Sequence, residues 1–140
     1  MSKKEKWFML LNGIQKDTYA LNVQMVKFND SLATLQKLVD GHIEHYIIDD
    51  ELDSHKIDMW INEEGKFRED FKPVFGLFYD GKLYDVIVGP CVFSKYDNQG
   101  NTLGLNDDDM YQVREFLRRC PMIEIRTTKG EVFPCLRVDK

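Results

Sequence analysis

The fold class is decided by the stretch Val74-Phe75-Gly76-Leu77-Phe78-Tyr79-Asp80-Gly81-Lys82-Leu83-Tyr84-Asp85-Val86-Ile87-Val88. Asp80-Gly81 is a dipeptide that readily adopts the positive φ angles of a two-residue hairpin turn. The runs on both sides of it are rich in β-branched and aromatic residues, which favour strands. The sequence therefore predicts an antiparallel hairpin with strands at residues 74–79 and 82–88.

Short strands are also predicted on both sides of this hairpin, at residues 7–12, 18–28, 43–48, 56–61, 91–96, 122–126 and 132–136. Each run is apolar or alternating and is bounded by turn-forming residues. Asn12-Gly13 is expected to turn between the first two strands, and residues 128–131 between the last two. The segment 67–73 is expected to be irregular, because Pro73 cannot donate a ladder hydrogen bond.

Two amphipathic helices are predicted. The first follows a choice of N-caps at residues 29–31, and Gly41 is expected to be its left-handed C-cap. The second begins after the N-cap Asn106 and ends before Pro121. Residues 107–109 are three aspartates in its first turn, where the helix dipole favours anions. We interpret them as a capping device and not as a metal cluster.

These elements predict an α+β fold: a single domain over residues 1–140, with a mainly antiparallel sheet of hairpins and two helices packed on it. Residues 49–54 are expected to form an acidic loop in solvent. If both helices cover one face of the sheet, Trp60 and Tyr46 stay uncovered on the other face. We therefore expect a homodimer or a higher closed oligomer that shares this face or an edge strand.

Charge and composition argue against several classes of function. The formal net charge is -5, which disfavours broad binding to DNA or RNA but leaves room for a local basic pocket that holds one small anion. Cys91, Cys120 and Cys135 are spaced neither as a disulfide framework nor as a zinc site, and are expected to be reduced thiols. The charged residues 1–6 and the lack of an 18-residue apolar run predict a cytoplasmic protein without a signal peptide or membrane span.

Catalytic signatures are missing from the sequence. The phosphate-binding, dinucleotide-binding, zinc-protease and nucleophile-elbow motifs do not occur. His42 and His45 are an odd number of residues apart, so on a strand they point to opposite faces and do not form a joint metal site. We expect no cofactor and no metal, and a non-enzymatic function. A small hydrolase that uses carboxylates or Cys91 is a third alternative.

The turn at residues 62–66 has two interpretations. In the structural one, Asn62 and Gly65 satisfy left-handed turn positions while the glutamates and Lys66 stay in water. In the functional one, an aromatic ring stacks on a base and neighbouring cations bind phosphates. The predicted ligand-binding residues are Trp60, Asn62, Glu63, Glu64, Lys66, Arg68, Lys72 and Arg126.

Residues 32–117 resemble a family of short proteins carried by bacteriophages, plasmids and other mobile elements, the domain of unknown function 3846. The resemblance rests on Leu35-x-x-Leu38-Val39-x-Gly41-x-Ile43-Glu44, Asn62-Glu63-Glu64-Gly65-Lys66, Lys72-Pro73, Asp85-Val86-Ile87-Val88-Gly89, Asp97-x-x-Gly100 and Leu105 before an acidic-capped helix. Asp40 departs from the pattern, because a second glycine is common there. The resemblance implies a mobile-element origin and no established activity.

We therefore expect a non-catalytic intracellular binding protein of a bacteriophage or mobile element. Its sharpest form is a counter-defence protein that sequesters a nucleotide-type second messenger. The alternative is an inhibitor that contacts a host enzyme through its aromatic-rich strands and the acidic segment 49–53.

Overall fold

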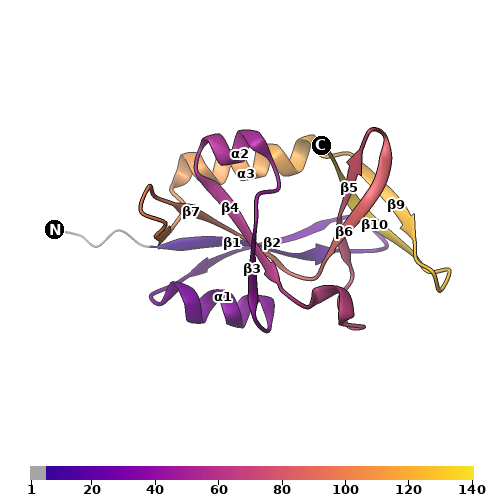
Figure 1. Cartoon of the computed structure of the whole chain (residues 1–140), viewed down its shortest axis with the longest axis horizontal. Coiled ribbons are helices and arrows are strands. Elements are labelled where there is room, and N and C mark those ends of the chain that lie inside the picture. The colour runs from indigo at the N-terminus through magenta and orange to yellow at the C-terminus, as the bar shows by residue number, and fades with distance from the viewer. Residues whose placement is uncertain (1–5) are drawn as a thin grey trace.

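The computed structural model describes residues 6–140, which form ten strands, three α-helices and one short 3-10 helix in an α+β arrangement (Figure 1). The first sheet has the order β2-β1-β7-β4-β3, with β8 paired to β7, and the second has the order β6-β5-β10-β9. The strands of the first sheet are β1 (Trp7–Ile14), β2 (Leu21–Lys27), β3 (Ile43–Tyr46), β4 (Ile57–Asn62), β7 (Cys91–Tyr96) and β8 (Thr102–Leu103). Those of the second are β5 (Pro73–Tyr79), β6 (Lys82–Val88), β9 (Met122–Arg126) and β10 (Val132–Asp139). The helices are α1 (Ser31–Val39), α2 (Asp50–Ser54), α3 (Asp107–Arg119) and the 3-10 turn η1 (Gly65–Phe67).

The first sheet lies in the middle of the molecule, with α1 on one face and α2 and α3 on the other (Figure 1). Strand β1 shows why, because its side chains alternate between the two faces. Phe8 and Leu10 pack with α1, whereas Met9 and Leu11 join the main core beneath α3 and the second sheet. The expectation that both helices cover one face is therefore wrong. Trp60 is half-buried and packs beside the α1 cluster.

The hairpin that decides the fold class is confirmed. Strands β5 and β6 are antiparallel, and Asp80 and Gly81 have φ angles of 51° and 77°. Two positive φ angles in a row are the requirement of a type I′ turn. Strand β10 adds to the other side of β5 in parallel. The expected α+β fold with mainly antiparallel strands is confirmed, although the strands form two sheets and not one.

Both ends of α1 and α3 follow capping rules. Asp30 accepts a hydrogen bond from the Ala33 amide, and Asn106 forms a reciprocal capping box with Asp109, so the aspartates of α3 include a cap, as predicted. The expected cap at Gly41 is wrong by one residue. Asp40 holds the left-handed conformation, with φ 60°. This conformation favours glycine, so a glycine at residue 40 would fit the same backbone.

Three local predictions fail. Residues 49–54 are not a loop: Asp49 accepts from the Leu52 amide at 3.1 Å and caps the short helix α2. Asn12 and Gly13 lie within β1, and the chain turns over residues 15–20 instead. The third prediction fails only at one end: residues 68–72 are irregular as expected, but Pro73 begins β5 and pairs with Val88, because the first residue of a strand tolerates a missing donor. No helix in residues 6–140 is long and apolar enough to span a bilayer, and the charged segment 1–5 lies outside the described residues.

Candidate functional site

The predicted ligand-binding residues do not form one site. Trp60 borders a pocket at β3 and β4, while Lys66 lies over β6. Lys72 borders a third pocket, between the two sheets. Arg126 is on β9, where it donates to the Gly130 carbonyl at 3.1 Å. The structure therefore does not bring the Trp60 ring and all of these cations to one pocket, although Asn62, Glu63 and Lys66 line the same one.

Asn62 is a structural residue of the turn. Its buried amide donates to the carbonyls of Val39 at 2.9 Å and Asp40 at 3.1 Å, and its Oδ1 accepts from the Glu64 amide at 2.7 Å. A Cβ atom on Gly41 would lie 2.7 Å from Asn62 Nδ2. The Asn62 side chain thus links the end of α1 to the turn at residues 62–66, whereas Glu63 and Glu64 are exposed.

The two cations of this turn are already neutralised. Lys66 forms an ion pair with Asp85. Arg68 donates to Asp70 at 2.7 Å and 2.8 Å and to Asp40 at 2.9 Å. These hydrogen bonds raise the pKa of Arg68 and lower that of Asp70. Because their charge is satisfied inside the protein, Lys66 and Arg68 are poor candidates for binding phosphates.

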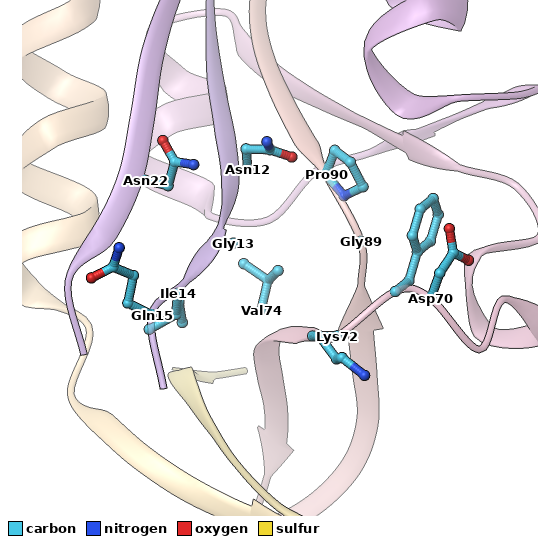
Figure 2. Close-up of a pocket in the computed structure, with 11 residues that line it drawn as sticks. Asn12, Gly13, Ile14, Gln15, Asn22, Asp70, Lys72, Val74, Gly89 and Pro90 are labelled. Carbon is cyan, nitrogen blue, oxygen red and sulfur yellow. The ribbon is translucent and has the colours of Figure 1, made fainter. Parts of the chain in front are cut away.

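A pocket between the two sheets is the better candidate, and we call it the inter-sheet pocket (Figure 2). It has a volume of about 350 Å³, within the roughly 300–1,000 Å³ of typical ligand sites. Its lining residues are Asn12, Gly13, Ile14, Gln15, Asn22, Asp70, Phe71, Lys72, Val74, Gly89 and Pro90. They come from the β1–β2 hairpin, the loop before β5 and the β6–β7 connection.

The polar groups of the inter-sheet pocket include two amides available to a ligand. Figure 2 shows Asn12 and Asn22 on two neighbouring strands at one side, with Pro90 and Asp70 at the other. Within residues 6–140, neither asparagine side chain makes a hydrogen bond, whereas Gln15 accepts one from Thr18 at 2.9 Å. Each free amide offers both donors and an acceptor. Sequence reasoning missed these residues, although Asn12 interrupts an apolar strand.

One lysine, Lys72, lines the inter-sheet pocket, and a second, Lys16, follows the lining residue Gln15. The ammonium groups of Lys72 and Lys16, the residue after Gln15, lie 5.3 Å and 5.0 Å from the centre of the Phe133 ring. Neither has an ion-pair partner among the described residues. The one carboxylate in the lining, Asp70, is offset by Arg68.

The cysteines do not form a reactive site. Cys91 and Cys135 are buried, and Cys120 is partly buried. Burial raises the pKa of Cys91, raises that of Cys120 to about 12 and raises that of Cys135 to about 11. Because the thiolate is the nucleophile, these groups are packed thiols, as the sequence predicts for reduced cysteines.

Comparison with known proteins gives one match. A family model described as "Domain of unknown function (DUF3846)" matches residues 14–118. The match begins nearer the N-terminus than the stretch 32–117 that carries the resemblance, so it includes most of the β1–β2 turn that borders the inter-sheet pocket. No curated protein and no solved structure matches the chain.

Proposed function

We propose, from the premise that the chain belongs to the DUF3846 family of domains of unknown function, that it is a non-catalytic binding protein for a small anionic ligand of nucleotide type. The ligand would occupy the inter-sheet pocket. The observation that carries this proposal is the convergence of two unpaired amides and the unpaired Lys72 on one pocket, with Lys16 next to the lining residue Gln15.

The chemistry of the pocket suits a nucleotide. Asn12 and Asn22 can pair with the donor and acceptor edge of a base, because an amide carries both kinds of group. Apolar surface for the flat faces of the base comes from Ile14, Val74 and Pro90. The two lysines would neutralise phosphates that extend outside the pocket. A volume of about 350 Å³ suits one nucleoside unit and not a whole oligonucleotide.

The biological setting that we propose is counter-defence. The resemblance to proteins of bacteriophages and mobile elements makes a nucleotide second messenger of host immunity the ligand of choice. A tight binder would remove such a messenger without chemistry, so no catalytic group is required.

Ligand recovery tests this proposal. The protein is incubated with cyclic dinucleotides, cyclic trinucleotides and ADP-ribose derivatives, freed of unbound ligand, and denatured to release what it holds. We expect one ligand to be recovered intact and to raise the melting temperature, because a ligand that binds only the folded state stabilises it. Lack of any thermal shift, or turnover of the ligand in the presence of divalent metals, would contradict the proposal.

Matched variants locate the ligand. Lys72→Glu reverses a charge at the rim, and we expect it to weaken binding at least tenfold. Lys82→Glu makes the same change at an exposed position that borders no described pocket, and should leave affinity within about twofold because distant exposed charges are screened. Equal loss in both variants would show that only net charge matters.

A second candidate function, contact with a host protein, is favoured by the edge of the second sheet. Strand β6 is an edge strand, and exposed edges pair with other chains. The Phe67 side chain beside it is 86% exposed and Tyr84 is 52% exposed. Exposed aromatic groups of this kind mark protein interfaces.

Affinity capture separates the two functions. We expect wild-type protein to release a small molecule on heating if it binds a nucleotide, or to retain one stoichiometric host protein if β6 is an interface. Phe67→Ser should abolish capture in the second case. Tyr111→Ser, which changes a similarly exposed aromatic residue on α3, should not.

A further inference from the structure

A second pocket, which shares no residue with the inter-sheet pocket, lies where β3, β4 and β7 meet. We call it the aromatic pocket. Its lining residues are His45, Ile47, Asp53, Asp58, Trp60, Tyr96, Gly100 and Thr102, and its volume is about 380 Å³. Three of these residues carry aromatic rings, two carry carboxylates, and none is a lysine or an arginine.

A chain of hydrogen bonds leads from the sheet interior to this pocket. Trp60 Nε1 donates to Ser94 Oγ at 2.9 Å, and Ser94 Oγ lies 2.5 Å from Asp58 Oδ1. The indole can only donate, so the Ser94 hydroxyl accepts from it and gives its one proton to Asp58. His45 Nε2 lies 2.8 Å from the other oxygen, Asp58 Oδ2. A hydrogen bond donated by His45 to Asp58 requires a proton on Nε2, and in that tautomer of the neutral ring Nδ1 is an acceptor.

These hydrogen bonds meet at a buried carboxylate, whose charged form is costly to remove from water. Asp58 is 3% exposed and Ser94 is fully buried, and a buried carboxylate is costly unless it is hydrogen-bonded. A set of hydrogen bonds that only joined strands could be fully buried. This one instead reaches the surface at the His45 ring, which is 46% exposed and lines the pocket.

The second carboxylate of the aromatic pocket has no cation. Asp53 Oδ1 accepts from the Tyr96 hydroxyl at 2.6 Å, and Asp53 forms no ion pair within the part of the chain that the structure describes. The pKa of Tyr96 is raised, first by this hydrogen bond, then by burial and by the negative charges of Asp53 and Asp58. The nearby ammonium of Lys56 is directed to the Asn98 side chain, at 2.6 Å.

We propose that the aromatic pocket binds an organic cation, a protonated amine or a guanidinium group. The Trp60 and Tyr96 rings would attract the positive charge, as aromatic faces do. Asp53 would accept a charge-assisted hydrogen bond, and the Nδ1 atom of a neutral His45 would be a second acceptor. The same pocket disfavours phosphates because both carboxylates are negative, so it cannot serve the anionic ligand of the inter-sheet pocket.

The indole N–H of Trp60 gives a direct readout of binding. The chain has two tryptophans, and Trp7→Phe assigns their two indole signals in a ¹H–¹⁵N spectrum. We titrate n-butylammonium and methylguanidinium, with n-butanol as the neutral isostere at matched ionic strength. We expect a saturable shift of the Trp60 signal with both cations and none with butanol. No saturable shift, or the same shift with butanol, would overturn the proposal.

Three variants test which residues of the aromatic pocket bind the cation. Asp53→Asn should raise the dissociation constant at least about tenfold, the weight of one charge-assisted hydrogen bond. Asp50→Asn, an exposed residue of the same helix outside the pocket, should leave it unchanged. Tyr96→Phe keeps the ring and frees Asp53, so binding should not weaken. Equal weakening by Asp53→Asn and Asp50→Asn, or loss of binding in Tyr96→Phe with the spectrum otherwise intact, would contradict the site.

One further titration distinguishes two sources of the cation, a lysine of a partner protein and a free amine. Tighter binding of N-acetyl-lysine amide than of n-butylammonium would assign the pocket to a lysine of a partner protein. Tighter binding of n-butylammonium would assign it to a free amine. If neither amine binds, the proposal fails together with the indole titration, whatever the inter-sheet pocket binds.

Discussion

Replacement of Asn62 by alanine should destabilise the fold through the loss of a single buried side chain. The amide makes three hydrogen bonds to backbone groups, two to the end of α1 and one to the Glu64 amide. Each such bond contributes about 1 kcal/mol net, and a buried group left unsatisfied costs about 1–3 kcal/mol. We therefore expect a loss of about 3 kcal/mol, and a fall in melting temperature of roughly 10 °C for a chain of this size.

Urea unfolding, followed by circular dichroism, measures this loss. The midpoint should fall while the slope with denaturant stays constant, because the surface exposed on unfolding hardly changes. Asn62→Asp should be at least as destabilising, since a carboxylate cannot donate to the Val39 and Asp40 carbonyls. Asn29→Ala is the control, an exposed asparagine without a hydrogen bond to the described residues. An Asn62→Ala variant within about 0.5 kcal/mol of wild type, the range of ordinary surface changes, would refute the reasoning.

Further predictions concern other contacts of the fold. Gly41→Ala should cost about 2 kcal/mol in urea unfolding, because its φ is +154° and the new Cβ would lie 2.7 Å from an amide nitrogen; an unchanged midpoint would contradict this. Arg68 lowers the pKa of Asp70, so the stability from this pair exists above the unfolded-state pKa and is lost as pH falls through the folded-state pKa. Asp70→Asn should therefore lower the melting temperature at pH 7 and converge with wild type near pH 2, whereas an equal difference at both pH values would exclude the ionic pair as its cause. Cys91 should react with a thiol reagent at neutral pH only after denaturation, because burial raises its pKa. Light scattering at micromolar concentration should give a mass above 16.5 kDa if an edge strand is shared, and Phe67→Ser should then shift it toward the monomer.

The elements that local rules determine could be predicted from the sequence. Asp80-Gly81 specifies its turn through two positive φ angles, and Asn106 caps α3 through an amide three residues away. Neither depends on distant parts of the chain. The acidic segment 49–54 was misjudged because a cap at Asp49 and one buried side chain, Leu52, outweigh its polar composition.

The candidate sites could not be predicted in the same way, because their chemistry depends on partners far along the chain. Arg68 looks like a phosphate ligand in the sequence, yet Asp70, two positions away, and Asp40, 28 positions away, both accept hydrogen bonds from it, and only the first of these partners is local. Lys72 was predicted, but its neighbours in the pocket, Asn12 and Asn22, come from the β1–β2 hairpin, far before it in the sequence. His45 and Asp58 become a pair only because β3 and β4 are antiparallel.

The parallel pairing of β10 with β5 has a consequence for the synthesis of the protein. Phe75 pairs with Leu136, which leaves the ribosome about sixty residues later, a delay of roughly 3–12 s at ~5–20 residues per second. Until then β5 and β6 form a hairpin with an open apolar edge, at the position where β10 will insert. The nascent chain therefore passes through a stage in which a chaperone or a second nascent copy competes with its own last strand. Slow codons after residue 79 would lengthen that stage, and conditions that speed elongation should raise the soluble yield without any change in the sequence.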